Sequence, residues 1–242
     1  PVRWAEYHAN IPVYYDYVSL SNASNMTINT VERQRQVFAG TMLSHAVIRR
    51  AFADLPAYTD QPYVNNFRDY IPHVRLQLAS VRYPNQPINK IFSDWKQTTE
   101  ELMDFVSFGR AFNNKPNYNR VWKAVEPRLL GLSTETEKAT AIYNFVTGSI
   151  TWNGYFSRYS DRTPNKVYDA AEGTSGEISV MLLALLKEAG IKADPLLVPL
   201  RNSGSPVELY PLLTQFQHSM VLANLDGKPT MLDPNSPSRP MG

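Results

Sequence analysis

A single apolar run in the C-terminal third constrains the fold more than any other part of the sequence. Its apolar residues recur at steps of three and four, the pattern of one face of an α-helix: Ile178, Met181, Leu182, Leu185, Leu186 and Ala189. Thr174 and Glu177 fit a Thr-x-x-Glu capping box at the start, and Gly190 fits a left-handed cap at the end. The sequence therefore predicts a helix that is buried along its length.

Ser175 falls in the first turn of this predicted helix. Unpaired backbone N–H groups and the positive end of the helix dipole stabilise negative charge at such a place. A cysteine there would be activated, whereas a serine does not ionise and needs a general base within hydrogen-bond reach. Ser175 is therefore a candidate nucleophile that depends on a nearby base.

A predicted β-hairpin downstream offers that base. Residues 216–225 and 228–233 read as strands, and Asp226-Gly227 between them is a strong signal for a two-residue hairpin loop. The loop length matters because one more residue would shift the register and turn side chains to the opposite face.

His218 and Asp233 come together in that register. Met220 faces Asp233 and His218 faces Asn235, so His218 and Asp233 are diagonal neighbours, roughly 7–8 Å apart at the backbone. An imidazole and a carboxylate can hydrogen-bond at this separation. Ser175, His218 and Asp233 thus fit the nucleophile, base and orienting residue of a catalytic triad. Each also has a structural interpretation: a first-turn serine, a hydrogen-bonded strand histidine and a turn aspartate.

The segment from Glu135 to Pro234 resembles the core of the transglutaminase-like superfamily. The pieces that match are, in chain order, residues 139–146, Ile150-Thr151-Trp152-Asn153, residues 173–191, His218 and Leu232-Asp233-Pro234.

The resemblance implies an α+β fold of papain type, in which a nucleophile helix packs on an antiparallel sheet. It implies Ser175, His218 and Asp233 as the catalytic positions, with Trp152 and Glu177 as binding positions. Trp152 is placed to line the cleft, although we favour core packing for it. Glu177 falls where the family commonly has an acidic residue.

The chain departs from that family at the nucleophile, where a cysteine is usual. It contains no cysteine at all, so thiol chemistry cannot run in this sequence. We favour a natural pseudoenzyme that keeps a cleft for a peptide, a protein or a cell-envelope polymer. The alternatives are an active Ser-His-Asp acyltransferase or amide hydrolase, a serine engineered to silence the site, and a purely structural envelope module.

Residues 1–112 read as a separate β-rich domain that ends in a short helix. Alternating runs such as 13–18 and 73–78 predict strands of a β-sandwich. Ser93 is a candidate cap for a helix that continues through Phe105.

Residues 111–119 read as a polar connector, so we place the transglutaminase-like core at 113–242. Residues 55–84 resemble the later half of a β-rich domain of unknown function that precedes such cores in bacterial envelope proteins. That resemblance implies a periplasmic or cell-surface location in a bacterium. A partial domain also predicts that the chain is a piece of a longer protein.

Composition narrows the range of partners. The 24 basic and 22 acidic residues include no cationic run, which argues against nucleic acid and anionic membrane surfaces as partners. Without cysteine there is no disulfide or thiolate metal site, and His8, His45 and His73 lack ligand spacing, so no metal or cofactor is predicted. No apolar run is long enough to span a bilayer.

Overall fold

The structure is a computed structural model of the chain, and it describes residues 1–242 except 22–24, 60–63, 65, 92–93, 236–240 and 242. The chain forms two compact units. The N-terminal unit contains Pro1–Thr98 and Arg201–Pro211, and the C-terminal unit contains Thr99–Leu200 and Leu212–Gly242. The domains placed at 1–112 and 113–242 stay a prediction.

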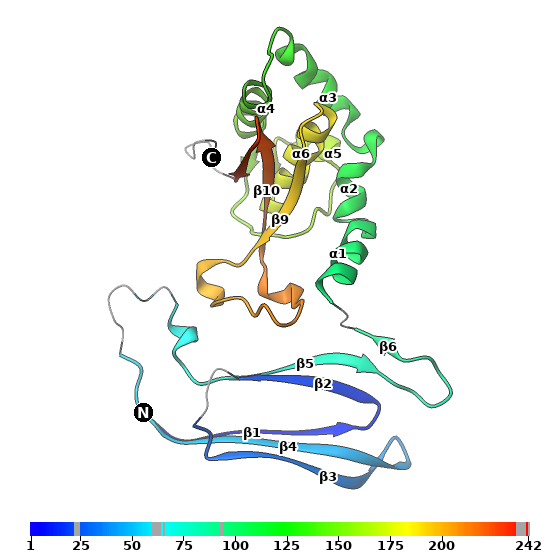
Figure 1. Cartoon of the computed structure of the whole chain (residues 1–242), viewed down its shortest axis with the longest axis vertical. Helices are drawn as coiled ribbons and strands as arrows, with labels where there is room; N and C mark the ends of the chain where they lie inside the picture. The colour runs from blue at the N-terminus through cyan, green and yellow to red at the C-terminus, as the bar shows by residue number, and fades with distance from the viewer. Residues whose placement is uncertain (22–24, 60–63, 65, 92–93, 236–240, 242) are drawn as a thin grey trace. The chain divides into compact units, whose positions relative to one another are not determined.

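Two antiparallel sheets make up most of the N-terminal unit (Figure 1). One has the order β1-β4-β3, with β1 at Val2–Pro12, β4 at Thr41–Leu55 and β3 at Ile28–Phe38. The other has the order β2-β5-β6, with β2 at Tyr15–Ser21, β5 at Val74–Val81 and β6 at Asn89–Lys90. A 3₁₀ turn, η1, covers Phe67–Asp69. The β-rich character is confirmed, whereas a sandwich stays a prediction.

The N-terminal strands differ in detail from their predicted ranges. The predicted strand over 73–78 lies within β5 apart from its first residue. The predicted strand over 13–18 is wrong at its start, because Val13 and Tyr14 form the turn between β1 and β2.

A loop from the second half of the sequence completes the N-terminal unit. The Asp69 carboxylate accepts hydrogen bonds from the Ser205 backbone N–H (2.8 Å) and hydroxyl (3.0 Å). The Asn66 amide donates to the Arg201 carbonyl oxygen over 2.8 Å. These bonds explain why residues 201–211, which include η4 at Arg201–Ser203, group with the first hundred residues.

The C-terminal unit is built around one buried helix and an antiparallel sheet (Figure 1). The helix, α6, spans Ser175–Glu188, and all its residues through Leu186 are buried. The sheet has the order β11-β10-β9, with β9 at Ala193–Val198, β10 at His218–Leu225 and β11 at Lys228–Leu232. Helix α6 packs on β10 and β9, as the predicted α+β fold requires.

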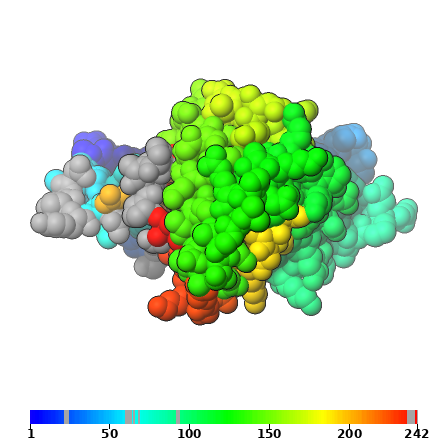
Figure 2. Space-filling view, turned by 90° about the horizontal axis from the view of Figure 1, so that it is seen from above, coloured from blue at the N-terminus to red at the C-terminus, as the bar shows by residue number. Residues whose placement is uncertain are grey.

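Further helices contribute to the same core. They are α1 at Trp95–Asp104, α2 at Gly109–Asn113, α3 at Asn119–Val125, α4 at Glu135–Ser149 and α5 at Pro164–Ala170. The connecting 3₁₀ turns are η2 at Lys115–Asn117, η3 at Glu126–Leu129 and η5 at Leu213–Gln215, and a short parallel pair joins β7 at Thr151–Trp152 to β8 at Glu172–Gly173. Figure 2 shows the outer surface of the helical layer, coloured green, on one face of this unit.

The polar connector predicted at 111–119 is wrong. This segment holds most of α2, all of η2 and the start of α3, and Phe112 in α2 is buried in the core against α6. The predicted cap Ser93 lies outside the described residues. Helix α1 begins at Trp95, where the Asp94 carboxylate accepts a hydrogen bond from the Gln97 N–H over 2.8 Å. It ends at Asp104.

None of the helices in the described parts of the chain has the length and apolar character that crossing a bilayer requires. Within the same residues, no group of three or more acidic, histidine or cysteine side chains is placed to hold a metal ion.

Candidate functional site

The start of α6 forms as the sequence predicts. Thr174 is the N-cap, and its hydroxyl accepts a hydrogen bond from the Glu177 N–H over 3.3 Å. The Glu177 carboxylate accepts from the Thr174 N–H over 2.9 Å, which completes the capping box. The helix ends at Glu188, and Gly190 follows with φ +80°, the left-handed conformation predicted for it. Ser175 is therefore fixed in the first turn.

A glycine beside Ser175 lets another part of the chain lie directly on this helix start. A Cβ atom on Gly176 would lie 2.3 Å from the Tyr159 carbonyl oxygen and 2.8 Å from that of Ser157. Both distances are far shorter than a van der Waals contact, so only glycine permits this approach. The segment 155–159 consequently packs main chain to main chain against α6.

The Ser175 hydroxyl is bonded to this segment. It donates to the Ser157 carbonyl oxygen (3.0 Å) and accepts from the Ser157 N–H (2.8 Å). The Ser175 backbone N–H donates to the Tyr155 carbonyl oxygen over 3.1 Å. Ser175 has 0% of its surface exposed. Because a hydroxyl carries a single proton, the proton of Ser175 is committed to Ser157 in this arrangement.

The hairpin that carries His218 has the predicted register. Asp226 and Gly227 have φ values of +50° and +84°, as a two-residue hairpin loop with two left-handed positions requires. Val221 pairs with Leu232, and Leu225 pairs with Lys228, which are the pairs expected for this loop.

The structure brings His218 and Asp233 together. His218 Nε2 lies 3.3 Å from Asp233 Oδ1, and both side chains are buried. The Asn235 amide donates to the same carboxylate oxygen and lies 3.4 Å from His218 Nε2. The Tyr143 hydroxyl of α4 donates to the Asp233 carbonyl oxygen over 2.7 Å and holds the end of β11 in place. Asn235 joins this group because the predicted register sets it opposite His218.

Aromatic side chains cover the imidazole. The rings of Phe156 and His218 meet edge to face with 5.2 Å between centroids, and the Trp152 ring lies 4.9 Å from that of Phe156. The Trp152 indole N–H donates to the Tyr155 carbonyl oxygen over 3.0 Å, and its ring packs against the hydrophobic core. Trp152 thus supports the segment that lies on Ser175.

Glu177 holds an ion pair as well as the helix cap. Arg162 donates from Nε to Oε1 (2.8 Å) and from Nη2 to Oε2 (2.7 Å) of Glu177, which is 3% exposed. Burial alone would raise the pKa of the Glu177 carboxyl, but hydrogen bonds from Arg162 and Thr174 outweigh it and hold the pKa below its ordinary value. A binding role for Glu177 stays a prediction.

Arg162 is a residue that the sequence analysis missed. A glutamate within an otherwise apolar buried helix requires a cationic partner, so the position of Glu177 signals that one exists. No spacing rule identifies which arginine it is.

The segment 155–159, which we call the covering segment, is also hydrogen-bonded to the sheet. The Ser219 hydroxyl of β10 donates to the Arg158 carbonyl oxygen over 3.0 Å, and the Arg158 guanidinium donates to the Phe216 carbonyl oxygen over 2.9 Å. The Ser179 hydroxyl of α6 donates to the Ser219 carbonyl oxygen over 2.6 Å. The segment 155–159 is therefore an integral part of the site.

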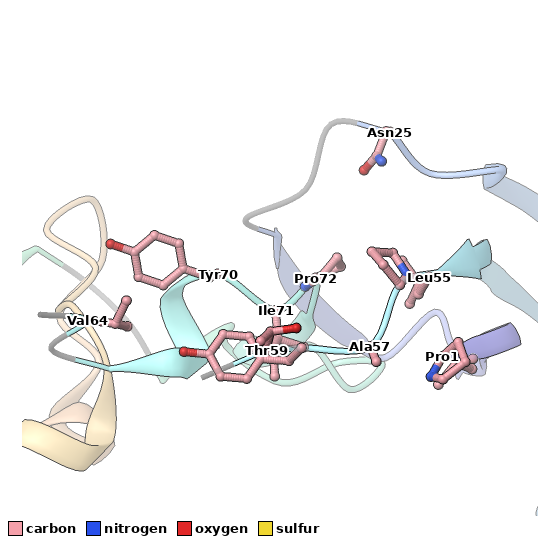
Figure 3. Close-up of a pocket in the computed structure, with 12 residues that line it drawn as sticks. Pro1, Asn25, Leu55, Ala57, Thr59, Val64, Tyr70, Ile71 and Pro72 are labelled. Atoms are coloured by element: carbon pink, nitrogen blue, oxygen red, sulfur yellow. The ribbon is translucent and has the colours of Figure 1, made fainter. Parts of the chain in front are cut away.

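A large hollow lies in the N-terminal unit (Figure 3). It measures about 750 Å³, and its lining is mostly apolar, with Leu55, Tyr58, Tyr70, Ile71 and Pro72 among its walls. None of the predicted site residues lines it, so its position gives it no part in the chemistry predicted for Ser175.

Comparison with known proteins agrees with this architecture. The model of the transglutaminase-like superfamily matches residues 123–220, which include Ser175 and His218 and end before Asp233. A crystal structure from Parabacteroides distasonis, described as a "putative protease", superposes with a TM-score of 0.63 at 16% sequence identity. The match covers 95% of this chain and 40% of that chain, so this chain spans less than half the length of its neighbour.

No curated protein matches the sequence significantly. At 16% identity the structural likeness establishes the fold alone. The family match falls on the part of the chain in which α6 packs on an antiparallel sheet, and we conclude that residues 123–220 of this chain are similar to a transglutaminase-like core.

Proposed function

We propose that the transglutaminase-like core is a non-catalytic binding module, a pseudoenzyme whose serine has a structural task. One observation carries the proposal: the Ser175 hydroxyl is buried and holds both the N–H and the carbonyl oxygen of Ser157. A nucleophile must instead be open to its substrate and share its proton with a base. Ser175 thus holds the segment 155–159 against the start of α6.

Energetics support the same interpretation. A serine hydroxyl is a much weaker acid than a thiol, so a site shaped for a thiolate gains little from the helix start when oxygen replaces sulfur. We expect the substitution to raise the barrier by about 5 kcal/mol, which is between three and four orders of magnitude in rate. Breaking two hydrogen bonds to free Ser175 adds to that barrier.

The ligand we propose is a peptide, a protein or a cell-envelope polymer. Tyr155 and Phe156 are 72% and 45% exposed, although both belong to the segment that lies on Ser175. Exposed aromatic rings supply large contact areas for such ligands. We place the protein in the bacterial periplasm or at the cell surface, on the resemblance of its β-rich region to envelope proteins.

A serine-directed fluorophosphonate tests the proposal. We expect no covalent labelling of Ser175 after prolonged incubation, measured by intact-protein mass spectrometry. Labelling that disappears in His218→Ala would overturn it and establish an active serine.

The second candidate is an acyltransferase or amide hydrolase with Ser175 as nucleophile. It is favoured by the arrangement of His218, Asp233 and Asn235, which is the one an imidazole base needs. In this mechanism the segment 155–159 moves away, and His218 accepts the Ser175 proton as Ser175 Oγ adds to the carbonyl carbon of a substrate amide. The C–N bond then breaks, and the proton passes from His218 to the departing amine, which leaves an acyl ester on Ser175.

A cysteine at position 175 tests whether the segment 155–159 keeps reagents away from this position. We expect Ser175→Cys to react slowly with iodoacetamide near neutral pH, because the thiol is covered. A matched pair, Phe156→Ala and Tyr155→Ala in the Ser175→Cys background, tests the cover. Only the former removes a ring that packs on His218, so only it should raise the alkylation rate. Equal rates in both would contradict the assignment of Phe156 as cover.

A further inference from the structure

A polar trough runs along one face of the β1-β4-β3 sheet in the N-terminal unit. It measures about 400 Å³ and is lined by Glu6, His8, Asn10, Glu32, Gln34, Gln36, Val47 and Arg49. The C-terminal unit contributes none of these residues. The trough is therefore a feature of the β-rich unit by itself.

Strand alternation and register produce the trough. On this face, β1 and β3 carry long polar side chains, whereas the central strand β4 carries Val47 opposite Asn10 and Glu32. On the same face of β4, Arg49 lies between Val47 and Ala51, and Val47 and Ala51 are buried. The outer strands lie about 10 Å apart, twice the spacing of paired strands. The floor of the trough thus combines the apolar Val47 with the Arg49 side chain, and it lies between two polar walls.

Hydrogen bonds orient the side chains of the two walls and leave part of their hydrogen-bonding capacity unused. The Gln36 amide donates to Gln34 over 3.3 Å, and Gln34 donates to Glu32 over 3.5 Å. Asn10 on the opposite wall donates to Gln36. Each carboxamide has two N–H donors and two acceptor lone pairs, so capacity for further hydrogen bonds remains in every one.

The trough has no surplus of positive charge. Arg49 pairs with Glu6 over 2.7 Å, and the hydrogen bond from Arg49 holds the pKa of the Glu6 carboxyl below its ordinary value. Glu32 is the other carboxylate in the lining. A phosphate, a sulfate or a nucleic acid would therefore find no net attraction here.

An extended peptide is also a poor occupant. Strand β4 pairs with β1 on one side and with β3 on the other, so its backbone groups are already used. A peptide that binds by adding a strand needs unpaired backbone groups, and the floor offers none. Recognition in the trough must come from side chains.

We infer that this trough binds a neutral oligosaccharide lengthwise. Carboxamides present paired donors and acceptors, and carboxylates present acceptors, that match adjacent sugar hydroxyls. Val47 offers an apolar contact to the C–H face of a sugar ring. Trp4, 48% exposed at one end of this face, has its indole N–H bonded to Glu6 over 3.1 Å and presents a flat ring for stacking. The inference is independent of the function proposed for Ser175.

Affinity electrophoresis of the whole chain tests it, with hydroxyethyl cellulose, xylan and glucomannan as probes. We expect at least one polymer to retard the protein. The double variant Gln34→Ala/Gln36→Ala should weaken binding at least tenfold in calorimetry with the matching hexasaccharide. The control Arg33→Ala/Arg35→Ala changes exposed side chains on the opposite face of β3 and should bind as the unmodified chain does.

Three results would overturn the inference: no retardation by any of the three polymers, equal weakening in both double variants, or binding to heparin alone. Circular dichroism establishes that each variant is folded. The Ser175→Ala variant should bind the polysaccharide normally, which separates this site from the transglutaminase-like core.

Discussion

Helices α4 and α6 begin with the same motif in opposite surroundings. Both have a Thr-x-x-Glu capping box in which the two reciprocal hydrogen bonds are formed. At α4 the box is exposed, and the Asp226 carboxylate of the hairpin loop bonds to the Glu135 N–H (3.1 Å). At α6 the box is enclosed, and Arg162 bonds to its glutamate.

The comparison shows that a capping box forms from local residues, whereas its contribution to the free energy of unfolding depends on residues far away in the sequence. The two boxes have the same internal geometry. What differs is the further partner of each box, which is the Asp226 carboxylate at α4 and the Arg162 guanidinium at α6, and the exposure of the box to solvent. Exposure matters because a buried unpaired polar group costs far more free energy than an exposed one. Matched substitutions at the two helices measure this difference.

The largest contrast is expected for the glycines of the two helices. Gly176→Ala places a methyl group 2.3 Å from the Tyr159 carbonyl oxygen, and we expect it to destabilise the protein by about 3 kcal/mol. Gly148→Ala in α4 meets nothing within 4 Å and should stabilise the protein by up to about 1 kcal/mol. Urea unfolding measures both. Similar losses in the two variants would contradict the close packing of segment 155–159.

The glutamates of the two boxes come next. Glu177→Ala leaves Arg162 without its ion pair and the Thr174 N–H without an acceptor, and we expect a loss of about 2 kcal/mol, discounted because Arg162 is one-third exposed. Glu137→Ala acts on an exposed carboxylate and should lower the urea midpoint less. If Glu137→Ala lowers the urea midpoint as much as Glu177→Ala does, the contribution of the box does not depend on its distant partners.

The threonines should differ by less. Thr134→Ala removes an exposed cap and should reduce the free energy of unfolding by about 1 kcal/mol. Thr174→Ala removes a half-buried cap and should reduce it by about 2 kcal/mol. Serine at either position restores the acceptor and should recover most of the loss. A failure of serine to rescue would place the effect in packing of the methyl group instead.

The smallest effect is the pH dependence at α4. Hydrogen bonds from the Thr136 hydroxyl and from the Glu135 and Thr136 N–H groups hold the pKa of Asp226 below its ordinary 3.8. The carboxylate therefore stabilises the fold above that pH, and its contribution disappears as the pH falls through the lowered value. We expect Asp226→Asn to reduce the urea midpoint at neutral pH and to converge with the unmodified chain in acid. A gap that stays constant between about pH 7 and pH 2 would refute this assignment.

The sequence was most informative where local rules act. Capping residues and apolar spacing located α6, and Asp226-Gly227 set the register that brings His218 beside Asp233. Each of these signals lies within a few residues of the structure that it predicts. Neither needs knowledge of the rest of the chain.

Helix α2 was missed because its reason for being helical lies elsewhere. The asparagines and proline between Asn113 and Asn119 are typical of a connector, yet Phe112 is buried and the Lys187 ammonium of α6 lies 5.3 Å from its ring. Tertiary packing overrides weak local propensity in such short helices.

The cover over Ser175 was missed for a related reason. Residues 155–159 have no periodicity that a sequence pattern could reveal, and their position follows from Gly176 and from hydrogen bonds to Ser175. A glycine directly after the candidate nucleophile does signal a close approach, although not which segment makes it. The roles of Ser175, His218 and Asp233 stay predictions.

The bonds that Ser157 makes to the Ser175 hydroxyl come from its main chain. Any residue except proline could make these two bonds. The Ser157 hydroxyl has a further role, because it donates to the Tyr159 carbonyl oxygen over 2.9 Å and accepts from the Tyr159 N–H over 3.1 Å, which fixes the turn of the segment. An inserted or deleted residue would instead displace the carbonyl and the N–H together. The length of this loop is therefore, beside its composition, a quantity through which evolution can open or close this core.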